Sequence, residues 1–321
     1  MRMITSDANQ EFFSFLREMV INPFLHGSKR LPPYICRVST ADQLCHHLYP
    51  QALLNEAVTV HGALVGRAIL VFRNETVNDL NSVLRERMPG VEHWFEVVNN
   101  VNVDEGAAAA ELFAVEYLQS INLASIPPSC LKLKSGAPLI LLRNLSPREG
   151  MCNGTRMRVL GISRTCLQVS ILGGKFDGMI CLLPRIKLTT TEKDLPFMLE
   201  RTQFPVRLCF VLTVNKSQGQ SLNQVGSDLR TPALSHGQLY VALWRVVSLD
   251  GLTLLPSEQT HQQKYYLRLI RRRCVLTLAT SFSRPVRPVR PELRCNLPCV
   301  LSCLATFRCI QTRPHSTSTS G

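Results

Sequence analysis

In residues 68–87, a continuous apolar run comes directly before a segment whose apolar residues have helical spacing. The run Ala68–Phe72 has the apolar density of a strand that is buried on both faces. Asn74–Arg87 follows it, with apolar residues at helical spacing. A strand followed at once by a helix is one unit of an α/β sheet. An α/β fold is therefore predicted for this part of the chain.

From Leu131 to about residue 190, the apolar runs become short and are separated by Gly, Pro and Asn. A spacing of about ten residues between such runs is typical of a small antiparallel β unit, and we expect it to be barrel-like. The α/β texture returns after Pro184. Phe204–Val214 is a strand candidate, residues 215–222 a loop that enters a helix, and Ser235–Val246 an amphipathic helix. The predicted arrangement is a β insert within an α/β domain.

Two further helices are predicted near the start of the chain. Phe12–Val20 carries apolar residues at the spacing that buries one helix face. Ser39 or Thr40 can cap a short helix that ends near Leu48, because a hydroxyl accepts a hydrogen bond from a free N–H of the first turn.

Composition favours one or two packed domains and a polyanionic partner. The chain has 321 residues, of which 45% are hydrophobic, and a formal net charge of +13. From Lys264 onward, eleven Lys and Arg stand against one acid, Glu292, so most of this charge lies at the end of the chain. That end also repeats proline too often for helix or strand. We expect residues 257–321 to form a disordered basic tail.

The twelve cysteines indicate reduced thiols inside the cell, because Met1–Val20 lacks the pattern of a secretory signal. No apolar run is long enough to cross a bilayer, so no membrane partner is expected. Cys295, Cys299, Cys303 and Cys309 do not form the paired units of structural zinc sites, and we expect no metal site.

Two segments carry the clearest chemistry, Thr213–Leu222 and Ser235–Val246. In the first, hydroxyl, ammonium and amide groups surround Gly219 at a predicted strand-to-helix turn, where backbone N–H groups can hold a phosphate. A capped helix start with a polar surface turn is the alternative. No G-x-x-x-x-G-K-[ST] phosphate loop occurs in the chain, and no acidic strand end follows an apolar run to hold magnesium.

From about Leu31 to about Leu255, the chain resembles the C-terminal half of the Pif family (petite integration frequency) of superfamily-one, 5′-to-3′ DNA helicases, especially its Helitron-associated branch. The densest matches are RAILVFRNETVNDLN, LKLKSGAPLILLRNLSPREGMCNGTRMRV, LPFMLERTQFPVRLCFVLTVNKSQGQSL and SHGQLYVALWRV. The family clamps ATP and Mg²⁺ between two RecA-like domains, and a small barrel is inserted into the second.

The resemblance implies an order of domains. It predicts a remnant of the linker and the first RecA-like domain (1–55), the second RecA-like domain in two parts (56–115 and 191–256), the inserted antiparallel β-barrel (116–190) and the basic tail (257–321). The first RecA-like domain, with its phosphate loop, is expected to be missing. The chain alone is therefore not expected to hydrolyse ATP.

The resemblance also assigns roles to residues of this chain. Contact with the backbone of single-stranded DNA carries over to Thr213, Lys216, Ser217, Gln218 and Gly219. Arg245 matches the catalytic arginine finger, which reaches the γ-phosphate. Asn74, Gln238 and Tyr240 match positions that frame or position the nucleotide. Trp244 departs from the family, which usually has serine there, and we expect its bulk to obstruct closure of the cleft or to rotate the helix.

A basic track for single strands is a further prediction for the β insert, on Arg143, Arg148, Arg156 and Arg158. Turn formers with solvated charge are the alternative.

The implied function is the C-terminal part of an ATP-dependent DNA helicase, which in the family unwinds DNA during repair, recombination and telomere maintenance. Single-stranded DNA and a first RecA-like domain are the predicted partners, and the nucleus is the predicted location. Two other readings stay open. One is a single-strand-binding module that works without ATP. The other is an inert relic of a mobile element, for which the cytoplasm is also a possible location.

Overall fold

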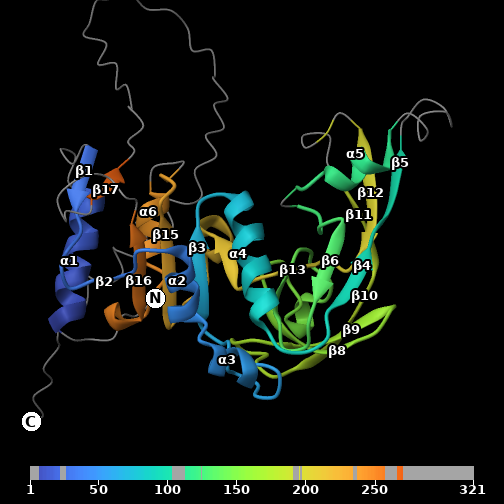
Figure 1. Cartoon of the computed structure of the whole chain (residues 1–321), viewed down its shortest axis with the longest axis horizontal. Coiled ribbons are helices and arrows are strands. Elements are labelled where there is room, and N and C mark those ends of the chain that lie inside the picture. Colours follow the sequence, from blue (N-terminus) through green and yellow to red (C-terminus); the bar gives the residue numbers. More distant parts are fainter. Residues whose placement is uncertain are drawn as a thin grey trace, which may run out of the picture. The chain divides into compact units, whose positions relative to one another are not determined.

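The computed structural model describes residues 7–21, 27–102, 113–123, 125–190, 195, 197–233, 237–256 and 266–269. Its centre is a five-stranded sheet in which every neighbouring pair is parallel (Figure 1). The strand order is β14 (Val211–Thr213), β3 (Arg67–Val71), β15 (Gln224–Leu229), β16 (Leu252–Pro256) and β2 (Cys36–Arg37). The prediction of an α/β fold is confirmed.

Strand β3 explains why both faces of this sheet are covered. Its side chains alternate, so that Ile69 and Val71 join one buried cluster while Ala68 and Leu70 join another. The first cluster includes apolar residues of α2 (Ala41–Leu48) and α4 (Asn74–Arg87). The second includes residues of α1 (Asp7–Ile21) and α6 (Gln238–Leu243). The sheet is therefore the middle layer of an α/β/α arrangement.

Helix boundaries follow the local signals in the sequence. Helix α4 has the predicted bounds, and α1 contains the predicted Phe12–Val20. Thr40 caps α2, because its side-chain oxygen accepts a hydrogen bond from the N–H of Gln43. The remaining helical segments are α3 (Gln51–Glu56), α5 (Val115–Ser120) and the 3₁₀ turns η2 (Pro147–Glu149), η3 (Val214–Ser217) and η4 (Leu249–Gly251).

The β insert consists of antiparallel sheets, which also take strands from residues 93–102 and 198–208, outside the predicted 116–190. A five-stranded sheet has the order β10 (Ile180–Pro184), β9 (Cys166–Ile171), β8 (Arg156–Ile162), β7 (Pro138–Leu141) and β13 (Val206–Leu208). A three-stranded sheet has the order β11 (Ile186–Thr189), β12 (Met198–Gln203) and β5 (Val98–Asn102). Strands β4 (His93–Glu96) and β6 (Cys130–Leu133) form a separate pair. The pairings among the described residues form open sheets and do not close into a single barrel.

The single strand predicted over Phe204–Val214 is wrong. The segment contains two strands: β13 pairs antiparallel with β7, and β14 pairs parallel with β3. Only Cys209–Phe210 lies between them. The cause is that the segment is apolar and buried in both sheets, so apolar density alone does not mark the change of sheet.

Two short strands lie where the sequence predicted other features. Strand β2 belongs to the parallel sheet, although residues 1–55 were assigned to the linker and the first RecA-like domain. Within the tail, Tyr266–Leu269 is strand β17, which pairs antiparallel with β1 (Gly27–Arg30), so disorder is the wrong prediction for these four residues. The rest of the tail, including its four clustered cysteines, lies outside the described residues.

Two buried arginines join the start of β3 and the segment before it to the five-stranded antiparallel sheet. Nη2 of Arg156 donates to the carbonyl of Arg67 at 2.7 Å. Nη1 of Arg158 donates to the carbonyls of Ala57 and Val60 at 2.9 and 2.8 Å. The two side chains are 7% and 6% exposed. They satisfy backbone groups instead of facing solvent, so the prediction that they line a basic track is wrong.

Gly136→Ala is expected to destabilise the chain by about 1–3 kcal/mol more than Gly62→Ala does. Both glycines have a positive φ, +82° and +100°, so both variants incur the same kind of backbone strain. A Cβ at position 136 would lie 2.6 Å from the carbonyl oxygen of Ala57, whereas one at position 62 meets nothing within 4 Å. Urea unfolding of the two variants tests this. Equal losses would show that the junction at Ala57 yields at little cost.

Candidate functional site: the junction of two motifs

The two segments singled out in the sequence meet in the structure. The N–H of Leu222 donates to the carbonyl of Arg245 at 3.0 Å, and the N–H of Val247 donates to the carbonyl of Leu222 at 2.9 Å. These two bonds form a parallel bridge between Leu222 and Val246. Nη1 of Arg245 also points to the carbonyl of Gln220 at 3.5 Å. The end of the first motif and the end of the second are therefore held together.

The first motif is a 3₁₀ turn. Strand β14 ends at Thr213, η3 follows, and Gly219 has a φ of +81°. The next regular element is strand β15, so the predicted entry into an α-helix is wrong. Gln218 and Gly219 are exposed, and Thr213 and Lys216 are half-buried. These four residues present the polar surface of the motif.

Ser217 corrects the predicted set of DNA contacts. Its side chain is fully buried, and its hydroxyl donates to the carbonyl of Val214 at 2.7 Å. A hydroxyl that already closes a turn inside the protein is not available to a phosphate. The structure therefore gives Ser217 a role in fixing η3.

Lys216 and Arg207 bring positive charge to this turn, and no ion pair with an acid is found for either within the described ranges. Burial lowers the pKa of Lys216, and the nearby charge of Arg207 lowers that pKa further. Arg207 donates to the carbonyls of Leu123 and Ile126 and to the side-chain oxygen of Asn122. Among the described residues, Arg207 has no carboxylate partner. Such uncompensated charge favours a polyanion at the adjacent surface.

The second motif forms a shorter helix than predicted. Helix α6 spans Gln238–Leu243, and Leu239, Leu243 and Val246 are all buried, as the apolar spacing predicts. Val246 lies in the bridge to Leu222 and not in the helix. Arg245 is half-buried, and its Nε donates to the carbonyl of Val241 at 3.2 Å.

Trp244 has a packing partner within the chain. Its ring lies 5.4 Å from the ring of Tyr240 in a stacked arrangement, and 5.6 Å from the ring of Phe13 on α1. The indole therefore contributes to the contact between α1 and α6, which gives it a structural role that the predicted obstruction did not include. Tyr240 shares this contact, and Gln238 is half-buried at the start of α6.

Asn74 lies apart from the motif junction. It is exposed at the first position of α4, beyond the carboxyl end of β3. The bridge at Leu222 precedes the amino end of β15, which is parallel to β3. The strand register thus places Asn74 and this bridge at opposite ends of the sheet.

The described residues do not form a complete nucleotide site. Glu75 occupies the first turn of α4, so a carboxylate stands where a phosphate would meet the N–H groups of the helix. Within the described ranges, no three His, Cys, Asp or Glu side chains gather as metal ligands do. Nor does any helix in the same ranges have the length and apolar character to cross a membrane.

The predicted site residues leave out Arg207 and also Gln220, although Gln220 is one of the amides of the first motif. Arg207 lies in the apolar run before the first motif, and a charged residue in a buried strand was the signal for it. The carbonyl of Gln220 accepts from Nη1 of Arg245, and Nε2 of Gln220 donates to the carbonyls of Gly154 and Lys216 at 3.5 and 3.4 Å. Gln220 thereby connects the motif to a turn of the β insert.

Of the other arginines proposed for a basic track, Arg148 is exposed and Arg143 donates to the carbonyl of Thr189.

Comparisons with known proteins point to one group of enzymes. The family described as DNA helicase Pif1, 2B domain, matches residues 116–162. Human ATP-dependent DNA helicase PIF1 is 31% identical over 173 residues, which cover 53% of this chain and 24% of the human protein. The Bdellovibrio bacteriovorus Pif1 helicase is 28% identical over 206 residues, which cover 61% of this chain and 44% of the bacterial protein. The chain thus matches less than half the length of either relative.

Solved structures of helicases are similar to part of this chain. The crystal structure of Pif1 helicase from Candida albicans has a TM-score of 0.51 and 21% identity, and it covers 77% of this chain and 53% of that protein. A Bacteroides Pif1 bound to single-stranded DNA has a TM-score of 0.49 and 18% identity, with 79% and 50% coverage.

Proposed function

Because the chain is a homologue of the Pif1 DNA helicases over part of their length, we propose that residues 31–256 supply the second RecA-like domain, with its β insert, of an ATP-dependent DNA helicase. The observation that carries this proposal is the bridge between Leu222 and Val246, which joins the two motifs. A contact with DNA at the first motif can thereby reach Arg245 in the second. The assignment of the chain to the Helitron-associated branch rests on the sequence resemblance.

Contact with single-stranded DNA is assigned to the polar surface of η3 and the turn after it. Lys216 supplies a positive charge, Thr213 a hydroxyl and Gln218 an amide, and Gly219 keeps the backbone of the turn open. Ser217 acts indirectly, by holding the turn closed.

Nucleotide chemistry is assigned to a site shared with another RecA-like domain. That domain would bring the phosphate loop and the acid that holds Mg²⁺, and this chain would bring Arg245, whose guanidinium carries a permanent charge. Asn74, Gln238 and Tyr240 remain proposed as positioning residues. The nucleus is the proposed location, and unwinding in repair, recombination and telomere maintenance is the proposed role.

A chimeric helicase tests the proposal. The 206 matched residues of the Bdellovibrio Pif1 are replaced by the matching residues of this chain, and ATP hydrolysis is measured with and without single-stranded DNA. We expect DNA-stimulated hydrolysis, because the parent supplies the phosphate loop. A chimera that folds and binds DNA but shows no stimulated hydrolysis would contradict the proposal.

A single-strand-binding module without ATPase activity is the second candidate. The uncompensated charges of Lys216 and Arg207 favour it. Residues 1–256, which keep α1 and lack the basic tail, would then bind a labelled oligonucleotide in isolation, while the chimera would remain inactive.

A further inference from the structure

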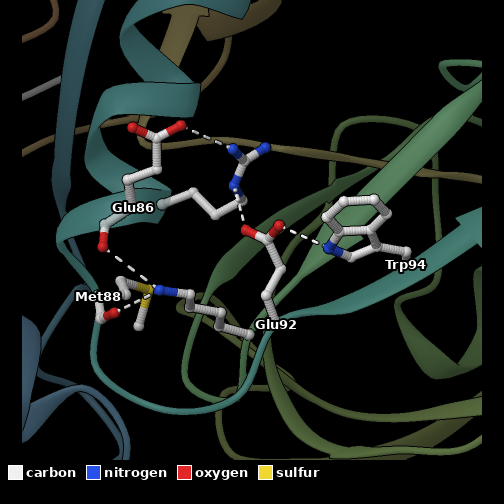
Figure 2. Close-up of polar contacts among 6 residues, drawn as sticks. Glu86, Met88, Glu92 and Trp94 are labelled. Atoms are coloured by element: carbon white, nitrogen blue, oxygen red, sulfur yellow. Dashed lines mark hydrogen bonds and ion pairs between the residues drawn. The ribbon is translucent and has the colours of Figure 1, made fainter.

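Trp94 is an exposed aromatic ring that is held in place from one side. It lies on β4 and is 64% exposed, whereas its neighbour Phe95 faces inward and is 6% exposed. Its indole N–H donates to Oε1 of Glu92 at 2.7 Å (Figure 2). The orientation of the ring is therefore fixed by a hydrogen bond at its edge, which leaves most of its surface in solvent.

The group that holds Trp94 is itself anchored to α4. Oε2 of Glu92 pairs with Nε of Arg85 at 2.8 Å, and Arg85 also pairs with Glu86 at 3.1 Å. Figure 2 shows this chain of contacts running from the helix to the indole. Lys134 directly follows β6, and its Nζ donates to the carbonyl of Met88 at 2.7 Å. This bond links the end of β6 to the end of the same helix. Because the ring is already ordered, little conformational entropy is lost when a ligand stacks on it.

Lys132 brings positive charge to the ring. It lies directly across from Trp94 in the pairing of β4 with β6, and its Nζ is 4.2 Å from the ring centroid. The acidic neighbour Glu92 pairs with Arg85, which also pairs with Glu86. Exposed Glu96 lies two residues further along the same strand face. The ring therefore lies among charges of both signs, unlike the apolar core of a protein interface, and Lys132 is the cation that contacts the ring.

We propose that Trp94 and Lys132 form a stacking platform for one base of a single-stranded nucleic acid, with Lys132 at the adjoining phosphate. Aromatic rings beside cations are the usual means by which proteins hold single strands without reading their sequence. The inference rests on the proposed function, because it assigns a second contact to the same strand.

Fluorescence gives a direct test in the full chain. The chain has two tryptophans, so Trp244→Phe leaves Trp94 as the only indole reporter. This protein is titrated with an oligothymidylate and with an abasic oligonucleotide of equal length, which keeps the phosphates and lacks the bases. We expect the oligothymidylate to quench Trp94 and the abasic strand to leave its emission unchanged.

Affinities measured by anisotropy complete the test. Trp94→Ala is expected to weaken oligothymidylate binding by about 5- to 150-fold, and Trp94→Phe by less, with little effect on the abasic strand. Lys132→Ala should weaken both. The control is Leu182→Ala, a truncation at another exposed apolar side chain on β10 (65% exposed), which should change neither affinity.

The outcomes separate this inference from the proposed function. If the wild-type chain binds no single strand, both are overturned. If it binds while Trp94 is neither quenched nor needed, the platform alone is overturned, and the exposed ring is left for a protein partner. Equal losses for both strands with Trp94→Ala would also overturn it, because stacking requires a base.

Discussion

Arg245→Ala in the chimeric helicase is expected to lower kcat for DNA-stimulated ATP hydrolysis by about 10³- to 10⁵-fold. An arginine that reaches a transferring phosphoryl group stabilises charge that develops only in the transition state. Arg245 is suited to this because the bridge at Leu222 fixes its backbone beside the first motif. Steady-state hydrolysis at saturating DNA measures the effect.

Controls must separate chemistry from structure, because Arg245, which follows α6, also donates to the carbonyl of Val241 in that helix. Arg245→Lys keeps the charge and loses the planar fork, and we expect it to remain strongly impaired. Exposed Arg164→Ala should leave kcat unchanged. If Arg245→Ala retains hydrolysis within tenfold of the parent chimera, or loses DNA binding and thermal stability to the same extent as activity, the assigned role is wrong.

Arg201→Ala is expected to lower the free energy of unfolding by about 3–5 kcal/mol. Arg201 is fully buried, and its guanidinium donates to the carbonyls of Leu118, Ile121 and Pro127 at 2.7–3.1 Å. Its Nε donates to the side-chain oxygen of Asn99 at 2.9 Å. Truncation would leave these acceptors buried without donors. Urea unfolding followed by circular dichroism measures the loss.

Arg201→Met tests whether polar contacts or volume matter. Methionine fills much of the space but leaves the same carbonyls unsatisfied, so we expect a loss close to that of alanine. Arg164→Ala should stay within about 0.5 kcal/mol of the parent, since its side chain is exposed. A methionine variant as stable as the parent would show that the carbonyls find other partners.

The sequence predicted elements whose signals are local. The unit of β3 and α4 carries both its apolar run and its helical repeat within twenty residues, and Thr40 marks its helix by a cap. The change of sheet between β13 and β14 could not be predicted in this way, because burial in either sheet demands the same apolar residues. Pairing partners lie far away in the chain, and periodicity does not identify them.

The candidate site shows the same division. The motifs identified Thr213, Lys216 and Arg245, and their contact through Leu222 is a finding of the fold. Burial of Ser217 was not predictable, because a serine beside a lysine is typical of an exposed turn, and the sequence does not distinguish that from a buried position. Arg207 acts on Lys216 through the packing of β13, which no local pattern reveals.

The link between β13 and β14 is only two residues long, so the two strands cannot move far apart at that point. A strand hydrogen-bonded to the insert continues almost at once as a strand of the parallel sheet, and then as the turn η3. A displacement of the insert would therefore reach η3 directly along the backbone, in addition to the side-chain contact of Gln220 with Gly154. Lengthening this link would remove the backbone route and leave the side-chain contact, so the distance between two strands along the chain sets how stiffly the insert and the turn are coupled.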